Sequence, residues 1–98
     1  MAAPLSPTTT GRLGTTTEVT VGAASAASAA FGTQTYGIRI CATNVCRYVV
    51  GDGTPTATAT STLLPANWVE VLTCSPGQKI AVIQEAAAGK LSITELLG

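Results

Sequence analysis

Residues 36–42 run Tyr36-Gly37-Ile38-Arg39-Ile40-Cys41-Ala42 and show the clearest alternation of apolar and polar positions in the chain. The even-numbered apolar residues share one side of an extended backbone, and Arg39 and Cys41 share the other. This period of two predicts a half-buried β-strand. Asn44 supplies a turn residue, and residues 45–50 are then predicted to form a hairpin with residues 36–42.

Three further strands are predicted on the C-terminal side of this segment, over residues 68–73, 79–84 and 91–96. Residues 79–84 are apolar on both faces, which is typical of a central strand. A turn at residues 75–78 precedes them, with Pro76 and Gly77 where a tight turn favours them. Many short strands at close spacing predict an all-β fold, a small antiparallel β-sandwich or a jelly-roll-like barrel.

Other parts of the chain leave alternatives open. Residues 18–21 alternate and predict a first strand. The alanine-rich residues 22–31 favour helix by propensity, but their bounding glycines leave room for barely three turns, so a small-residue strand leading to Phe31 is the prediction and a helix the alternative. Residues 56–62, rich in threonine and alanine, predict either an edge strand or an extended surface loop.

The first fourteen residues differ from the rest in composition. They are mostly Pro, Thr, Gly and Ser, with Leu5 and Leu13 as the large apolar side chains. Such a segment has little apolar surface with which to offset the entropy lost on ordering. We therefore predict a flexible, extended N-terminal arm over residues 1–14 and a single β-sandwich domain over residues 15–98. The arm is either a frayed terminus or a segment that becomes ordered on a neighbouring subunit.

Composition restricts the partners. Charged residues make up 10% of the 98 residues and the formal net charge is zero, whereas ordinary soluble domains have about 25% charged residues. A surface with so few charges suits contact with another protein. The five basic residues are scattered singly, which argues against nucleic acid. No run approaches the roughly 18 apolar residues of a spanning helix and no signal peptide is evident, so we expect no membrane partner and synthesis in the cytoplasm.

The residues available for chemistry are few. The sequence has no histidine, which removes the commonest general base and metal ligand. The cysteines lack the short spacing of a zinc knuckle, so no metal is expected. A disulfide between Cys41 and Cys46 is the alternative to free, buried thiols. The acidic residues lie on different predicted elements with no shared motif, namely Glu18, Asp52, Glu70, Glu85 and Glu95. We therefore predict that the chain is not an enzyme and has no cofactor.

Large aromatic side chains are the remaining candidates for binding. Trp68 and Tyr48 either fill the core or anchor an interface. Together with the two leucines of the arm they make up the predicted interface set, which is Leu5, Leu13, Tyr48 and Trp68.

The order of elements from Tyr36 to the end carries a family resemblance, over about two-thirds of the chain. The most specific part is Pro76-Gly77-Gln78-Lys79 followed by Ile83-Gln84 and the ending Ala88-Gly89-x-Leu91-x-Ile93-Thr94-Glu95. The other matching residues are Ile38-Arg39-Ile40, Ala42-Thr43, Cys46, Pro55-Thr56-Ala57-Thr58 and Leu64-Pro65-Ala66. In these residues the chain resembles small virion proteins of tailed bacteriophages.

The resemblance implies a head decoration or cement protein, a β-sandwich that sits on the outer surface of the capsid as a symmetric oligomer. Its implied partners are the major capsid protein and copies of itself, as a dimer or trimer, and it stabilises the capsid by bridging capsomers. The family has no catalytic residues to carry over, and residues 1–14 depart from its pattern. The alternatives are another virion part, such as a tail or head-completion protein, and a host-surface or carbohydrate binding module.

Overall fold

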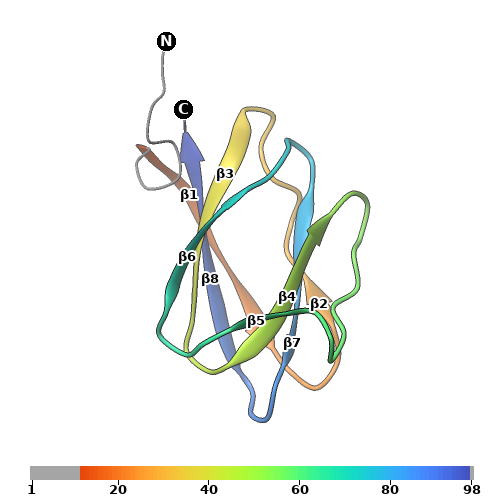
Figure 1. Ribbon diagram of the computed structural model, residues 1–98. Coiled ribbons are helices and arrows are strands. Elements are labelled where there is room, and N and C mark those ends of the chain that lie inside the picture. Colours follow the sequence, from red (N-terminus) through yellow and green to blue (C-terminus); the bar gives the residue numbers. More distant parts are fainter. Residues whose placement is uncertain (1–11, 98) are drawn as a thin grey trace.

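The computed structural model describes residues 12–97, and every regular element in that range is a β-strand (Figure 1). The strands form two four-stranded antiparallel sheets that pack against each other. The predicted all-β sandwich is therefore confirmed. The strands are β1 (Arg12–Val21), β2 (Ala26–Ala27), β3 (Thr35–Ala42), β4 (Cys46–Gly51), β5 (Thr62–Leu64), β6 (Val69–Thr73), β7 (Lys79–Gln84) and β8 (Gly89–Leu97).

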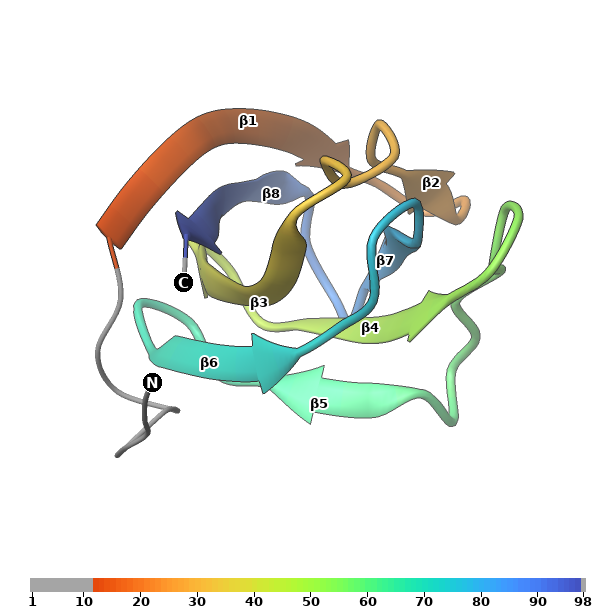
Figure 2. The ribbon, with the colours of Figure 1, turned by 90° about the horizontal axis from the view of Figure 1, so that it is seen from above.

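The order of strands is β1-β8-β3-β6 in one sheet, called sheet A, and β2-β7-β4-β5 in the other, called sheet B. Every connection except that between β4 and β5 crosses from one sheet to the other. The edge strands β5 and β6 consequently lie on the same side of the sandwich, and β1 and β2 lie on the opposite side (Figure 2). No helix within residues 12–97 has the length and apolar character needed to span a membrane.

The core lies between the sheets and is built from the inward positions that the alternation predicts. Ile38, Ile40 and Ala42 of β3 are almost fully buried, as are Leu91 and Ile93 of β8. β7 is central in sheet B and its Ile80, Ala81 and Val82 are all inaccessible to solvent, so the prediction of a central strand is confirmed. The remaining core side chains are Val19, Val21, Phe31, Cys46, Tyr48, Leu64 and Cys74.

The hairpin predicted for residues 36–42 and 45–50 is wrong. Both segments are strands, but β3 belongs to sheet A and β4 to sheet B. The turn between them is tied to β8 instead, because Thr43 N donates to Lys90 O at 3.0 Å and Lys90 N donates to Thr43 Oγ1 at 3.0 Å. Ala42 and Cys46 then enter one core from opposite sheets, so each strand keeps its apolar side inward without pairing with the other.

The alanine-rich segment is extended, as predicted, but only Ala26 and Ala27 form a regular strand, β2, beside β7. The chain stays close to β7 beyond β2, because Ser28 N donates to Ile80 O and Phe31 N donates to Gln78 O, both at 2.8 Å. Phe31 reaches the core, where it is buried. Contacts with β7 therefore overcome the helix propensity of alanine.

The threonine-rich stretch follows the loop alternative. Residues 52–61 lie outside any strand, and β5 begins only at Thr62. Ala57 N donates to Ser25 Oγ at 2.8 Å and the Ala57 side chain is buried. Arg47 Nη1 donates to Ser61 O at 3.0 Å, which holds the end of the loop against β4.

The turn at residues 75–78 forms as predicted. Gln78 N donates to Ser75 O at 3.2 Å, and Gly77 has a φ of 84°, a left-handed conformation that glycine adopts without steric cost.

The N-terminal boundary lies earlier than predicted. β1 begins at Arg12, so residues 12–14 belong to the strand rather than to the arm, and Leu13 pairs with Leu96 of β8. Pairing with β8 supplies the main-chain hydrogen bonds of these residues, which their composition could not reveal. Residues 1–11, including Leu5, lie outside the described residues, so the arm remains a prediction there.

Candidate binding surface

Exposed apolar side chains are concentrated at the corner between β5 and β6. Trp68, directly before β6, is 57% exposed, Val69 at the start of β6 is 42% exposed, and Leu63 of β5 is 46% exposed. The corner itself is made by Pro65, Ala66 and Asn67, with Asn67 at a φ of 58°. Leu63 faces outward from sheet B and Val69 faces outward from sheet A, so these apolar side chains surround the corner. Exposed apolar residues that gather at one place are a feature of interaction surfaces.

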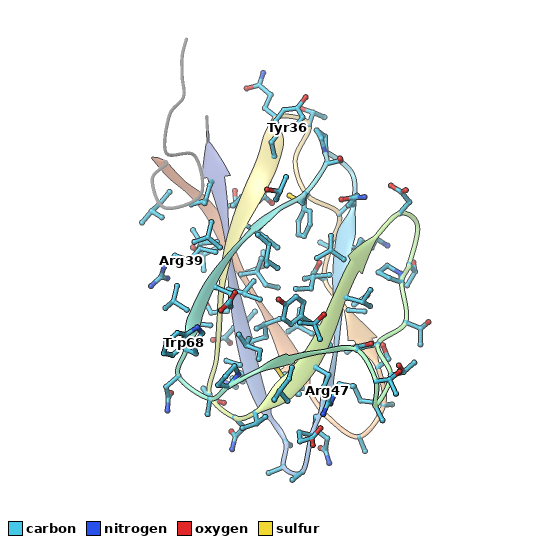
Figure 3. All side chains as sticks on the ribbon, viewed as in Figure 1. Tyr36, Arg39, Arg47 and Trp68 are labelled. Atoms are coloured by element: carbon cyan, nitrogen blue, oxygen red, sulfur yellow. The ribbon has the colours of Figure 1, made fainter. Side chains whose placement is uncertain are left out.

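The strand register extends this corner over the outer face of sheet A. Val69 and Val71 of β6 lie beside Cys41 and Arg39 of β3, on the side of the sheet that faces away from the core. We call these four residues the β3–β6 face. Figure 3 shows Arg39 and Trp68 on the same side of the sandwich, with Tyr36 towards the far end of β3.

Arg39 differs from Arg47 in its surroundings. Arg47 Nε donates to Glu85 Oε1 at 2.8 Å, and this ion pair holds the pKa of the Glu85 carboxyl below its usual value. Arg47 therefore has a structural role between β4 and the connection that follows β7. Arg39 is exposed and has no ion pair within residues 12–97, so its guanidinium is available to a partner.

Trp68, which directly precedes β6, is held in place by a hydrogen bond to that strand. Its indole Nε1 donates to Glu70 Oε2 at 2.7 Å, which restricts the orientation of the exposed ring. Glu70 is half-buried. It lies opposite Ile40 of β3 in the strand register, on the inner side of β6. Burial raises the pKa of Tyr48, and the negative charge of Glu70 raises it further. A fixed, exposed tryptophan loses little conformational entropy on binding, which suits it to be an anchor.

The structure separates the four residues of the predicted interface. Trp68 and Leu13 are exposed, Leu13 at 69%, but Trp68 directly precedes β6 and Leu13 lies on β1, and these strands are the opposite edges of sheet A. Tyr48 is only 9% exposed and packs in the core from β4, so it is not available as an anchor in this conformation. Leu5 lies outside the described residues. Of the three predicted interface residues within residues 12–97, only Trp68 belongs to the candidate binding surface.

The interface predicted from the sequence did not include Arg39, Val69 or Val71. The strand predicted over residues 68–73 has apolar residues on both faces, because Val69 and Val71 lie on one face and Leu72 lies on the other. Nothing in that pattern shows that β6 is an edge strand and that the valine side faces solvent.

The acidic side chains are dispersed over the sandwich. Glu18 lies 4.0 Å from Lys90 Nζ on the outer face of sheet A, and Glu85 is paired with Arg47. Glu95 accepts hydrogen bonds from Gly32 N and Thr35 Oγ1, which tie the segment before β3 to β8. Within residues 12–97, no three Cys, Asp or Glu side chains gather in a way that could hold a metal ion. The absence of catalysis remains a prediction.

All three cysteines are free, so the disulfide considered between Cys41 and Cys46 is not formed. Cys41 is half-exposed on the outer face of sheet A, whereas Cys46 and Cys74 are buried. Burial raises the pKa of the Cys46 thiol and of the Cys74 thiol, with a smaller contribution from Glu95 at Cys74. Both buried thiols are therefore unreactive in the folded protein.

We expect a thiol reagent to label Cys41 quickly near neutral pH and to label Cys46 and Cys74 only as the protein unfolds. Ellman's reagent with and without guanidinium measures this directly. Cys41→Ser should abolish the fast phase and leave the slow phase unchanged. Fast labelling of all three thiols would contradict the burial of Cys46 and Cys74.

Comparison of the chain with protein-family models, with curated proteins and with solved structures gives no match. The resemblance to virion proteins therefore stays a prediction.

Proposed function

We propose that this protein is a non-catalytic structural module that attaches to a larger protein assembly through the β5–β6 corner and the β3–β6 face. The observation that carries the proposal is the exposed Trp68 beside Val69, close to Arg39 of β3, which has no ion pair within residues 12–97. Tryptophan and arginine are the residues most enriched among those that dominate binding energy at protein interfaces.

The rest of the molecule suits a structural role. The exposed positions of the sandwich are largely threonine and alanine with few charges. With a formal net charge of zero, many copies can lie close together without electrostatic repulsion. Small sites repeated over a lattice also gain from multivalency, because each attached contact raises the effective concentration of the next.

In its specific form the proposal is a head decoration protein of a tailed bacteriophage, bound to the major capsid protein on the outer surface of the capsid and bridging capsomers. This form is supported by the resemblance over residues 36–98 and by the β-sandwich fold that the resemblance implies. No cofactor and no turnover are part of the proposal.

The copy number of the chain in purified particles tests this form. Virions of the phage that encodes the chain are separated by gel, and the band is quantified against the major capsid protein. A ratio near that of the major capsid protein would support lattice decoration. A handful of copies would indicate a tail or head-completion protein instead, and absence from the particle would reject a virion role.

Substitution of Trp68 tests the surface. Trp68→Ala is expected to weaken attachment to capsids by about tenfold or more, because truncating a central aromatic anchor costs about 2 kcal/mol. Tyr36→Ala is the matched control, since Tyr36 is a similarly exposed aromatic residue at the far end of β3. Occupancy on heads that lack the protein, measured after a wash, gives the comparison. Equal losses for both variants would place the contact elsewhere.

A carbohydrate-binding module is the second candidate, because Trp68 presents an exposed ring beside the carboxylate of Glu70. Sugars stack on aromatic rings and donate hydrogen bonds to carboxylates. Aromatic residues are 4% of the chain, however, and the other exposed aromatic residue, Tyr36, lies apart from Trp68. Titration of glycans against the fluorescence of Trp68, the single tryptophan, would detect this activity.

A further inference from the structure

The four edge strands of the sandwich differ in how well they are protected from pairing with another chain. β2 and β5 are only two and three residues long. β1 has an irregular register between Leu13 and Thr16 and carries Glu18 in an ion pair with Lys90. Short length, bulges and charges are the usual means by which proteins protect a sheet edge.

Of these protections, β6 has only a single charge, on Glu70. Its five residues pair with β3 in one continuous register and contain no proline. The outward-facing side chains Val69, Val71 and Thr73 are uncharged and β-branched, and such residues favour strand pairing. The one charged residue, Glu70, lies on the inner side and accepts a hydrogen bond from Trp68.

The hydrogen bonds to β3 define which main-chain groups of β6 are unused. Cys74 N donates to Tyr36 O at 3.0 Å, and these two residues continue the register in which Gly37 lies opposite Thr73. In an antiparallel pair, hydrogen-bonded positions alternate along each strand. Leu72 and Glu70 therefore bond to β3, whereas the N–H and C=O groups of Val69, Val71 and Thr73 point to the open edge.

We propose that two copies of this chain pair antiparallel through β6, with Val71 of one copy opposite Val71 of the other, so that their A sheets join into one continuous sheet. Val69 then lies opposite Thr73 of the second copy, and the open groups of all three positions are used. The pairing forms about six main-chain hydrogen bonds, two for each hydrogen-bonded pair.

Electrostatic repulsion and the orientation of the side chains favour this register over the neighbouring ones. A shift by one residue would turn the valines of one copy to the inner side. A shift by two residues in one direction places Glu70 opposite Glu70 of the second copy, and like charges directly opposed are destabilising. The opposite shift shortens the overlap by moving Val69 beyond the end of β6. Centred on Val71, the pair sets Glu70 opposite Leu72 and joins Val69, Val71 and Thr73 in a ladder of β-branched side chains.

The dimer uses part of the surface in the proposed function, and in that sense the inference rests on that proposal. The partner of the β6 edge is a second copy of the chain. Each half of the twofold dimer would keep its own exposed Trp68 and Leu63 at the β5–β6 corner. A single dimer would therefore present two attachment points to a lattice.

The test is the oligomeric state of the full chain under reducing conditions. Sedimentation equilibrium at about 100 µM chain should show a dimer for the natural sequence. Val71→Lys should weaken the dimer by about a hundredfold or more, because a lysine on an edge blocks pairing. Thr15→Lys, on the opposite edge strand of sheet A, is the matched control and should dimerise as the natural chain does. A monomeric natural chain, or an oligomer that Val71→Lys leaves intact, overturns the proposal.

Cross-linking tests the register itself. In a Cys41→Ser background, Val71→Cys should form a disulfide between two copies under mild oxidation, since opposed residues of a hydrogen-bonded pair have Cα atoms about 5.5 Å apart. Val69→Cys in the same background should not, because residue 69 faces residue 73. Equal cross-linking by both variants overturns the register. Neither measurement involves a capsid. A dimer that fails to bind particles would therefore reject the proposed function and leave the dimer intact. A monomer that binds particles would reject the dimer and leave the proposed function intact.

Discussion

Ile40→Asp is expected to prevent folding. Ile40 is inaccessible to solvent at the centre of the core, between Glu70 of β6 and Ile93 of β8 in the register of sheet A. An aspartate there would be an unpaired charge in an apolar environment, at a cost of several kcal/mol. A domain of this size has only about 5 to 15 kcal/mol of stability, so the folded state would be lost or nearly lost.

The neighbouring exposed residue provides the matched control. Arg39→Asp changes the adjacent position of the same strand, where the side chain faces solvent, and should leave the circular dichroism spectrum and the melting temperature close to those of the natural chain. Val82→Asp, at an equally buried position in sheet B, should behave as Ile40→Asp does. Cooperative unfolding of a soluble Ile40→Asp protein would show that the inward and outward faces of β3 are reversed.

Gly89→Ala is expected to destabilise the protein by about 1 to 3 kcal/mol, the usual cost of forcing an extra methyl into a close-packed site. A Cβ atom at Gly89 would lie 2.6 Å from Asn44 Oδ1 and 2.6 Å from Thr43 Oγ1, closer than van der Waals contact permits. The side chains of Thr43 and Asn44, in the turn between β3 and β4, would have to move away from β8. Movement of Thr43 would weaken its two hydrogen bonds to Lys90.

Gly22→Ala is the matched control, because a Cβ atom at Gly22 meets nothing within 4 Å. Thermal unfolding followed by circular dichroism should show a fall of about 4 to 8 °C in Tm for each kcal/mol lost at Gly89 and little change at Gly22. If both variants melt together with the natural chain, the close approach of the β3–β4 turn to β8 is not important for stability.

For the candidate binding surface, the sequence pointed to Trp68 as a candidate anchor but not to the residues around it. Trp68 was one of two candidate aromatic residues, and the structure exposes it while burying Tyr48. Both residues stand in stretches with mixed apolar and polar patterns, so local alternation could not separate them. Arg39 could be placed on a solvent-facing side from its alternation with Ile38 and Ile40, yet its neighbour Val71 comes from a strand more than thirty residues later in the sequence.

The sequence by itself determined where most strands lie and which side of several of them is buried. Alternation placed β3 and its inward isoleucines, the apolar run placed β7 at the centre of a sheet, and the Pro-Gly pair placed the turn before β7. These features depend on the period of the backbone and on the conformational limits of proline and glycine, which act within a few residues.

Only the tertiary structure decided which strands are neighbours. A short connection such as residues 43–45 can close a hairpin or cross between sheets, and the hydrogen bonds of Thr43 to β8 selected the crossing. The same non-local pairing placed Arg12 in β1 and left β6 at an edge, with Val69 and Val71 facing solvent. Pairing and exposure depend on contacts between distant segments, and the pattern of any one segment does not contain that information.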